Sequence, residues 1–497
     1  MPIDTATEDF YRLRLDHMID LRHSLAVLSS RMPWQQIEAS VSHIFSGKVR
    51  SGKKLSGIDL FGEQIQMSAV KSHAGRPRVP LRTMIALLYL KHAFNESDEG
   101  VVQRWSETPV WQFFGGRAYF DPTLPCDSTT LVKFRTLLGE DGVEELLAQT
   151  ITAAVNMRLI SPKELATVVV DSTVQSKAIA HPTDSKLLET ARQKLVAAAK
   201  DAGIDLKQTF AKEGLLLRFK AGRYAHAKQF KRMGRAIKRQ RTIVARIARQ
   251  MERGASALTQ AVRDALQGSL AKARQIVAQA ASRKNTGSAP KLYAWHAPEV
   301  ECIAKGKSKT PYEFGVKVGI AATLKHNLIV GARSFAGKPY DGHTLHEQLE
   351  QASILMQETG QKPQTAYVDL GYRGVDVDNP DIAIKHRGKF KTLTDQERKL
   401  LKRRQAIEPI IGHLKADHRM DRCYLKGEQG DRLNAVLCAA GYNIKWLLRM
   451  IAKKGVAFLR SLYLRLCEAV GVQPNWPQVL RELIRIASAE PNRLAIN

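Results

Sequence analysis

Residues 366–374 read Ala366-Tyr367-Val368-Asp369-Leu370-Gly371-Tyr372-Arg373-Gly374, and the fold predicted for this chain follows from them. The stretch indicates a short apolar strand that ends at Asp369, with a tight turn after it. Thr394 and Glu397 form a capping box, which predicts that a helix follows and carries Glu408. A carboxylate at the end of a buried strand and a second one on a nearby helix are typical of a divalent-metal site.

A third acidic residue lies far upstream, in the sequence Val168-Val169-Val170-Asp171-Ser172-Thr173. The apolar, β-branched run 165–170 predicts a strand covered on both faces, and Asp171 is the acid that this strand supplies. Asp171 and Asp369 are 198 positions apart (369 − 171), which leaves room for an insertion. Asp369 and Glu408 are 39 apart (408 − 369), which suits a loop and part of a helix. Each acid alone is an ordinary turn or helix residue, so the prediction depends on all three together.

The order of the predicted elements favours an α/β ribonuclease H-like catalytic core. A hairpin is predicted by the period-two alternation of 313–320 and the apolar strand at 328–332. Thr344 and Glu347 predict a capped helix between this hairpin and the strand that ends at Asp369. Apart from a helical insertion after the first strand, this is the element order of a ribonuclease H-like core.

Changes in composition divide the chain into four parts. Residues 1–160 are predicted to form a mainly α-helical N-terminal domain for DNA binding or oligomerisation. Residues 161–184 and 308–451 form the catalytic core. Residues 185–307 form a basic α-helical insertion, and residues 452–497 form a helical C-terminal tail.

A helix-turn-helix is one of two interpretations of residues 80–107. The apolar residues of 83–92 suit a helix with one buried face, and Ser97 suits the N-cap of a second helix. Three arginines would then lie near phosphates, namely Arg76, Arg78 and Arg82. A helical packing or dimerisation domain explains the same pattern, and the sequence leaves both interpretations open.

The net charge of the 497-residue chain is +29, which indicates a polyanionic partner. A membrane surface is the competing explanation, but the longest apolar run, at 437–451, is interrupted by Lys445 and Arg449. The first residues do not resemble a signal peptide. Five scattered cysteines fit a reducing cytoplasm. No phosphate-binding glycine motif occurs, so we expect no nucleotide cofactor.

The predicted insertion is the most basic part of the chain. Residues 218–253 contain thirteen Lys or Arg and one acid, Glu252. Helix surfaces that only face solvent usually mix the two signs of charge, so phosphate binding is the favoured interpretation. The expected DNA contacts are Lys231, Arg232, Arg235, Lys238, Arg239 and Arg241. Aromatic residues among these cations (Phe219, Tyr224 and Phe230) are expected in a core, in preference to stacking on bases.

Phosphodiester cleavage needs an activated oxygen nucleophile and a neutralised leaving oxygen, which two divalent ions supply. Asp171 is expected to bridge both ions, with Asp369 and Glu408 each holding one. Arg404 and Lys415 fall on the helix face of Glu408, where they would hold the DNA backbone. Pairing of Arg404 with Glu408 on the helix surface is the alternative. Pro409 is expected to kink this helix or to begin a new one.

Five motifs resemble those of the DDE transposases of bacterial insertion sequences, in the IS-five family. The resemblance spans roughly residues 75–450. The motifs are Val170-Asp171-Ser172-Thr173-Val174, His181-Pro182-Thr183-Asp184-Ser185, Tyr340-Asp341-Gly342-His343-Thr344-Leu345, Tyr367-Val368-Asp369-Leu370-Gly371-Tyr372-Arg373-Gly374 and Arg404-Gln405-Ala406-Ile407-Glu408-Pro409-Ile410-Ile411-Gly412-His413-Leu414-Lys415.

The resemblance implies that Asp171, Asp369 and Glu408 are a catalytic, metal-binding triad with Mg²⁺ (or Mn²⁺) as cofactor. It implies that Arg404 and Lys415 hold transposon-end DNA, and Arg373 joins them as a candidate DNA contact. It also implies a ribonuclease H-like fold and a homo-oligomeric synaptic complex on double-stranded DNA. The family signature has a tyrosine three residues before the arginine of the last motif, where this sequence has Leu401.

The leading hypothesis is therefore a DNA transposase of the bacterial cytoplasm, associated with the nucleoid. It would bind terminal inverted repeats, nick DNA at the ends of the element and use the freed 3′-hydroxyl to attack target DNA. One alternative is a structure-specific nuclease with the same core and no joining step. Another is a domesticated DNA-binding protein in which the three acids have no catalytic role.

Overall fold

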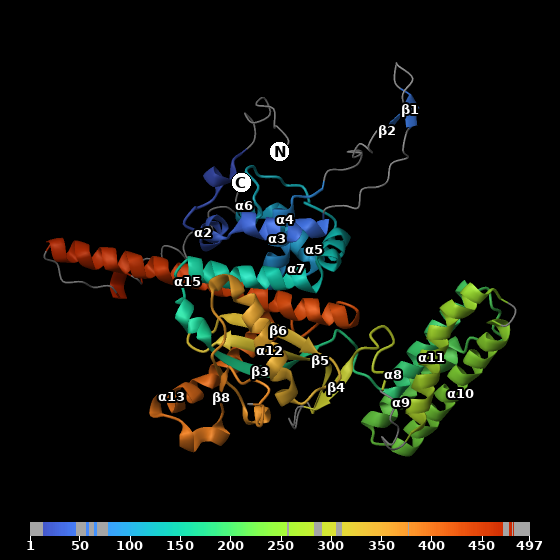
Figure 1. Ribbon diagram of the computed structural model, residues 1–497. Coiled ribbons are helices and arrows are strands. Elements are labelled where there is room, and N and C mark those ends of the chain that lie inside the picture. Colours follow the sequence, from blue (N-terminus) through green and yellow to red (C-terminus); the bar gives the residue numbers. More distant parts are fainter. Residues whose placement is uncertain are drawn as a thin grey trace.

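A six-stranded mixed β-sheet lies at the centre of the chain in the computed structural model (Figure 1). It is formed by β3 (Thr167–Ser176), β4 (Glu301–Ala304), β5 (Tyr312–Thr323), β6 (Ile329–Phe335), β7 (Thr365–Tyr367) and β8 (Ala383–Lys385). The structure describes residues 13–45, 56–58, 64–66, 78–255, 258–282, 291–304, 311–375, 377–470, 477–479 and 481.

The strand β3 is at the middle of this sheet. It pairs antiparallel with β5 along almost its whole length and parallel with β7 on its other side. The outer edge of β5 is shared by β4 and β6, both antiparallel to it, and β8 extends the sheet parallel to β7. The long β3–β5 pairing arises because 168–170 and 318–322 are apolar and buried.

The predicted hairpin is confirmed as β5 and β6, joined by a turn in which Asn327 has a φ of 61°. The prediction that Thr344 and Glu347 cap the next helix is wrong. The helix α12 (Asp341–Leu355) has Tyr340 as its N-cap and begins four residues earlier than predicted, and the Thr344 hydroxyl donates to the carbonyl of Asp341 within its first turn.

Residues before the sheet are mainly helical, as predicted, in the part of the chain that the structure describes. The helices are α1 (Leu15–Met18), α2 (Ser24–Arg31), α3 (Trp34–Phe45), α4 (Leu81–Ala93), α5 (Asp98–Glu107), α6 (Pro109–Phe114) and α7 (Ser128–Asn156). A two-stranded hairpin, β1 (Ser56–Ile58) and β2 (Gln64–Gln66), is the addition that the sequence did not predict.

The prediction of one buried face on α4 is wrong, because residues 83–93 are all buried. The helix is enclosed by α5, α7 and the long helix α15 (Gly427–Val470), so no side of it faces solvent. Ser97 caps α5 as predicted, since its hydroxyl accepts from the amide of Gly100 at 2.8 Å. The exposed residues of α5 carry two acids and a single arginine: Glu99, Gln103, Arg104 and Glu107.

Two of the arginines expected near phosphates are bound to protein groups instead. Arg82 donates to the Phe114 carbonyl at 3.2 Å and the Ser29 hydroxyl at 2.9 Å, and its guanidinium stacks on Trp34. Arg78 donates to the carbonyl of Phe45. These contacts and the acidic surface of α5 favour the packing interpretation of 80–107 over the helix-turn-helix, while Arg76 lies outside the described residues.

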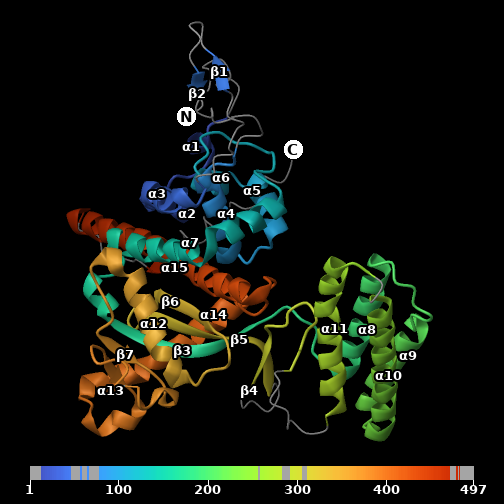
Figure 2. The same cartoon turned by 45° about the vertical axis from the view of Figure 1, so that its right-hand side comes forward.

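The helix α15 separates the N-terminal helices from the sheet (Figures 1 and 2). It contacts α4 and α7 on one side and β6 on the other. Residues 427–455 of α15 are the one stretch of the described chain that is long and apolar enough to cross a membrane. About two thirds of the apolar window (67%) is buried inside the protein, as expected for a core helix.

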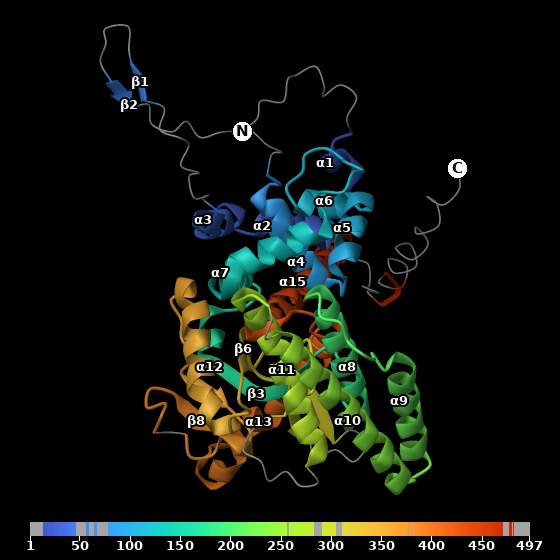
Figure 3. The ribbon, with the colours of Figure 1, turned by 90° about the vertical axis from the view of Figure 1, so that its right-hand side faces the viewer.

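Four helices between β3 and β4 form a unit with its own apolar core, beside the sheet (Figures 2 and 3). They are α8 (Asp184–Asp201), α9 (Ala211–His226), α10 (Phe230–Ala255) and α11 (Gln260–Ala281). Lys177, just after β3, forms ion pairs of 2.8 Å with Glu299 and Asp431. All three side chains are buried, so one cation ties the two ends of the insertion to the start of α15.

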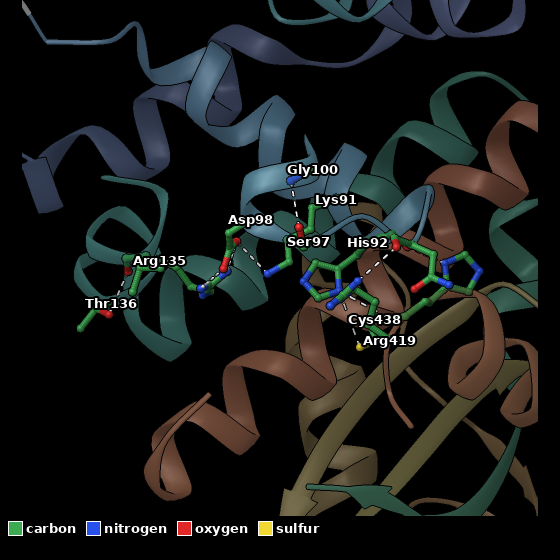
Figure 4. A network of polar contacts seen from close by, with 12 residues as sticks. Lys91, His92, Ser97, Asp98, Gly100, Arg135, Thr136, Arg419 and Cys438 are labelled. Carbon is green, nitrogen blue, oxygen red and sulfur yellow. Dashed lines mark hydrogen bonds and ion pairs between the residues drawn. The ribbon is translucent and has the colours of Figure 1, made fainter. Parts of the chain in front are cut away.

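Buried polar contacts join the N-terminal helices to the segment after Glu408 (Figure 4). The Nδ1 of His418 lies 2.8 Å from the carbonyl of His92, and the Nδ1 of His92 lies 3.4 Å from the carbonyl of His418. Because carbonyls only accept, each Nδ1 carries the proton. Next to them, Asp98 pairs with Lys91 at 2.8 Å and with Arg135 at 3.0 Å.

Acidification is expected to weaken this junction. Burial is the main cause that lowers the pKa of His418 from 6.5 to about 4. The unfolded chain therefore takes up this proton more readily, so stability is highest above pH 6.5 and falls as the pH decreases towards 4. We expect His418 to contribute a loss of roughly 2 kcal/mol at pH 5, and the buried His92, whose pKa is also lowered by burial, to add to the loss measured by urea unfolding.

The matched variant His418→Asn keeps an N–H donor but has no titrating group at this position. Its free energy of unfolding should therefore decrease less between pH 7 and pH 5 than that of the native chain. His343→Gln, at an exposed histidine, serves as the control and should behave as the native chain. Equal pH dependence in all three proteins would contradict the role given to His418.

Candidate active site

Asp171 and Asp369 lie on neighbouring strands of the sheet. The predicted strand that carries Asp171 is confirmed as β3, which continues beyond this residue to Ser176. Asp369 follows β7 by two residues and precedes a 3₁₀ turn at Leu370–Tyr372. The parallel pairing of β3 with β7 brings together two acids that are 198 positions apart in the sequence.

Arg404 joins the two aspartates. Its Nη1 lies 3.2 Å from Oδ2 of Asp171, and its Nη2 lies 3.6 Å from Oδ1 of Asp369. The arginine side chain is 10% exposed, whereas the Asp369 side chain is 54% exposed. The alternative pairing of Arg404 with Glu408 does not occur among the described residues, because the guanidinium is directed towards the aspartates.

Several neighbouring groups shift the pKa of the Asp171 carboxyl in opposite directions. Burial has the largest effect, and together with the nearby Asp369 charge it raises the pKa of Asp171 above its ordinary value. The amide of Ser172, which donates to Asp171 at 2.8 Å, and the guanidinium of Arg404 act in the opposite direction. A partly buried carboxylate of this kind gains strongly from a bound cation.

Glu408 is four residues after Arg404 in the sequence, but the two residues lie in different elements. The predicted helix from the Thr394 capping box is interrupted: α13 (Asp395–Arg403) is followed by a 3₁₀ turn and then by α14 (Ile407–Asp417). Pro409 lies in the first turn of α14, as predicted, where its missing N–H costs no hydrogen bond. Glu408 is exposed there and forms no ion pair within the described residues.

The other two expected DNA contacts of this region differ from each other. Lys415 is partly buried, and its ammonium lies 3.2 Å from the carboxylate of Glu313 on β5. The sequence analysis missed Glu313, because an acid in an alternating strand carries no signal of its own. Arg373 is exposed on the turn after Asp369, where its charge faces solvent.

A second polar group supports β3 beside the aspartates. Asp341, at the start of α12, accepts from the Ser172 hydroxyl at 2.8 Å and from the Lys317 ammonium at 3.0 Å. The buried Tyr372 ring lies beside them, and burial raises the pKa of its hydroxyl well above 10. Asp341 is both a helix-entry residue and a partner of the site, and Ser172 and Lys317 are functional candidates that the sequence analysis missed.

The oxygen ligands of this site fit a hard divalent cation such as Mg²⁺. Asp171 and Asp369 are close enough to share one guanidinium, each through a different nitrogen of Arg404. In the described part of the chain, no group of three or more His, Cys, Asp or Glu side chains is arranged to hold a metal. The structure therefore brings together two of the three predicted ligands, with Glu408 on the next helix.

The predicted phosphate contacts of the insertion lie on one face of α10. Exposed cations follow each other at helical spacing, and the opposite face, with Ile243, Val244 and Ile247, is buried in the unit's core. The exposed cations are Lys231, Arg232, Arg235, Lys238, Arg239, Arg246, Arg249 and Arg253. Arg239 pairs with Glu213, and Arg241 is only partly exposed.

The expectation that the insertion's aromatic residues are core residues is wrong for two of them. Phe219 is 60% exposed on α9, and Phe230 is 62% exposed at the start of α10. Tyr224 is partly buried. The unit's core is formed mainly by aliphatic side chains together with Trp295, so the Phe219 and Phe230 rings are not part of it.

Two family models match this sequence. The model described as "Transposase domain (DUF772)" matches residues 13–137, and the one described as "Transposase DDE domain" matches residues 375–448. The second match contains Arg404 and Glu408, whereas the two aspartates lie outside both. These matches define the class of protein as one with transposase domains.

A relative from Rhizobium meliloti, named "Uncharacterized protein ORF8 in nfe locus", is 39% identical to this chain over 222 residues. The aligned part is 45% of this chain and 95% of the relative. The chain therefore belongs to the same family as this rhizobial protein, and it carries one transposase domain and one transposase DDE domain. No solved structure matches the chain.

Proposed function

We propose that this protein is a transposase that binds the terminal inverted repeats of an insertion sequence and catalyses metal-dependent strand cleavage and strand transfer. The observation that carries this proposal is the meeting of Asp171 and Asp369 around Arg404 at the centre of the sheet. The two transposase-domain matches and the net charge of +29 support it. Membership of the IS-five family rests on the five sequence motifs.

A ribonuclease H-like catalytic core is part of the same proposal. The sheet order β6-β5-β3-β7-β8, with three antiparallel strands followed by two parallel ones, supports it. The separate core of α8–α11 supports the assignment of 185–307 as an inserted unit. The protein would act in the bacterial cytoplasm, on DNA of the nucleoid.

Asp171, Asp369 and Glu408 would hold Mg²⁺ or Mn²⁺, which supplies an activated oxygen nucleophile and neutralises the leaving oxygen. The residues of the chain perform the remaining tasks. Ser172 and Asp341 fix the strand that carries Asp171, and Arg404 balances the charge of the two aspartates. Glu408 would complete the ligand set as α14 approaches bound DNA.

Binding of DNA would involve two surfaces of the chain. Arg373, on the turn after Asp369, would contact the phosphates next to the scissile bond. Lys415, which pairs with Glu313 on β5, would contact phosphates along α14. The cationic face of α10 would contact phosphates farther from it. A homo-oligomeric complex would hold two transposon ends together.

The test is cleavage of a plasmid that carries this gene with its native flanks, in Mg²⁺ or Mn²⁺, with the native chain and with Glu408→Gln. Nicks at a pair of inverted repeats, absent with the variant, would support the transposase and identify its ends. Cleavage without preference for those ends would favour the structure-specific nuclease. Tight DNA binding without a metal-dependent product would favour the domesticated DNA-binding protein.

Neutralising the α10 face is expected to reduce the salt dependence of binding to duplex DNA. The triple variant Lys231→Gln, Arg235→Gln and Lys238→Gln removes three exposed cations. The slope of log K against log salt should decrease by up to about 3 units, because each phosphate contact contributes about 0.9. Fluorescence anisotropy between 50 and 200 mM salt, a range suggested by the usual size of the effect, would measure it.

The matched control replaces Lys194, Lys200 and Lys207, which are exposed cations elsewhere in the same helical unit. It has the same change in net charge. If both triple variants shift the slope equally, the effect is one of overall charge, and the α10 face is not the phosphate contact.

A further inference from the structure

A groove of about 390 Å³ runs between α10 and α11, which lie side by side in the helical unit (Figure 2). Alanine side chains form most of its floor. They are Ala245 and Ala248 of α10 and Ala273, Ala278 and Ala281 of α11. Because these side chains are small, a ligand in the groove can come close to the backbones of both helices.

Arginines border this groove. Arg241 and Arg249 of α10 and Arg274 of α11 are among the residues that line it. Glu252 is the one acid among them, and it is bound to Arg274 at 2.6 Å. In the part of the chain that the structure describes, neither Arg241 nor Arg249 pairs with a carboxylate. These two cations are therefore left for a ligand.

The contacts of the two arginines with the protein are few. Nε of Arg249 donates to the Ala245 carbonyl of its own helix at 3.3 Å. Nε of Arg241 is buried and donates to no group within the described ranges of the chain. A guanidinium carries five N–H donors, so both side chains keep donors for an anionic partner.

The row of cations continues along α10 beyond the groove. Lys238 and Arg235, both exposed, are three and six residues before Arg241, on the preceding turns of the helix. Arg235 and Arg249 are 14 positions apart (249 − 235), which is about 21 Å along the helix axis. A compact anion would meet only part of this row, whereas a chain of regularly spaced phosphates can meet all of it.

An apolar floor with a cationic border fits the sugar–phosphate backbone of DNA. Guanidinium groups bind phosphate oxygens through paired hydrogen bonds, and the carbon atoms of deoxyribose would contact the alanine methyl groups. A second copy of the groove would bring like charges together. An apolar helix would leave Arg241 and Arg249 unpaired.

We propose that the α10–α11 groove binds the sugar–phosphate backbone of one strand of duplex DNA, with Arg241 and Arg249 on its phosphates. This deepens the proposed function, on which it rests for DNA as the ligand. The cationic face of α10 surrounds the bound strand with positive charge, and the groove fixes where that strand lies. The acidic site takes no part in this contact, so binding can be measured without metal.

Neutral side chains that fill the groove test this contact without a change in net charge. Ala245→Leu with Ala278→Leu places larger side chains over the floor, and leucine is a good helix former at both positions. Binding of a labelled mixed-sequence duplex of about 20 base pairs should weaken roughly ten-fold or more, because the strand loses its phosphate contacts in the groove. Fluorescence anisotropy without metal measures the affinity, and thermal unfolding shows whether the variant is folded.

The matched control is Ala225→Leu with Ala265→Leu, at exposed alanines of α9 and α11 outside the groove. Ala265 is nine residues before Arg274, which places it on the opposite side of α11. This variant should bind the duplex as the native chain does. Native affinity in the groove-filled variant would overturn the inference.

A second pair of variants removes the charges and decides the question if the groove-filled variant is unfolded. Arg241→Gln with Arg249→Gln should reduce the slope of log K against log salt by up to about 2 units, since each phosphate contact contributes about 0.9. Lys194→Gln with Lys200→Gln, at exposed residues of α8, has the same change in net charge and should reduce the slope less. Equal slopes in the two variants would contradict the proposed contact.

Two further outcomes separate this groove from other roles. An oligomeric native chain that becomes monomeric on size-exclusion chromatography when the groove is filled would identify the groove as a contact between copies, and would overturn the inference. Failure of the plasmid assay, with groove-dependent duplex binding intact, would count against the transposase and not against this site.

Discussion

Asp171→Asn is expected to abolish DNA cleavage, by at least about a thousand-fold, while the protein stays folded. Asparagine keeps the shape of the side chain and its hydrogen bond from the Ser172 amide, and it removes the negative charge that a divalent cation needs. The variant loses the ion pair with Arg404, but burial already disfavours the charged form of Asp171 and Asp369 still pairs with the arginine, so the protein should remain folded. Plasmid nicking in Mn²⁺ and thermal unfolding are the two measurements.

Asp381→Asn is the matched control, since this carboxylate is exposed and lies two residues before β8 of the same sheet. It should cleave as the native chain does. Retained Mn²⁺-dependent cleavage by Asp171→Asn would remove Asp171 from the catalytic triad. Loss of cleavage together with unfolding would be resolved by Asp171→Glu, which keeps the charge and should retain folding and cation binding.

Arg404→Gln is expected to reduce cleavage roughly 10- to 100-fold, the usual effect of removing a group that supports a metal ligand. It should also reduce stability by about 1–3 kcal/mol. This is less than for a fully buried ion pair, because Asp369 is half exposed. The guanidinium competes with any other cation for the charge of the two aspartates, so the variant should bind Mn²⁺ at least as tightly as the native chain.

Two further variants separate charge from packing at this position. Arg404→Lys keeps a cation beside the aspartates and should restore most of the stability. Arg403→Gln removes the neighbouring arginine, which donates only to backbone carbonyls of the β5–β6 turn, and should leave Mn²⁺ binding unchanged. Weaker Mn²⁺ binding in Arg404→Gln would show that the arginine assists the metal site.

The sequence predicted the parts of the site that have a strong local pattern. The apolar run before Asp171, the strand before Asp369 and the capping box at Thr394 are each a local signal, and each element formed where it was expected. The pairing of β3 with β7 followed from the order of elements, so the meeting of the two aspartates was predictable as well.

Contacts between segments that are far apart in the sequence could not be predicted from local patterns. The partners of Arg404 and Lys415 are residues of other elements, and helical periodicity placed both on the face of Glu408 instead. The complete burial of α4 depends on α15, which is more than 300 positions away. The exposure of Phe219 and Phe230 depends on how four helices share one core, which composition cannot show.

The ion pairs of Lys177 have a consequence for removal of the helical unit. The insertion departs just after β3 and returns just before β4, and Glu299 at its return meets the same lysine that marks its departure. Its two ends are therefore neighbours in space, although 122 positions separate them in the sequence (299 − 177). A short loop between β3 and β4 could span this distance, so removal of the four helices is expected to leave the pairing of β3 with β5 intact.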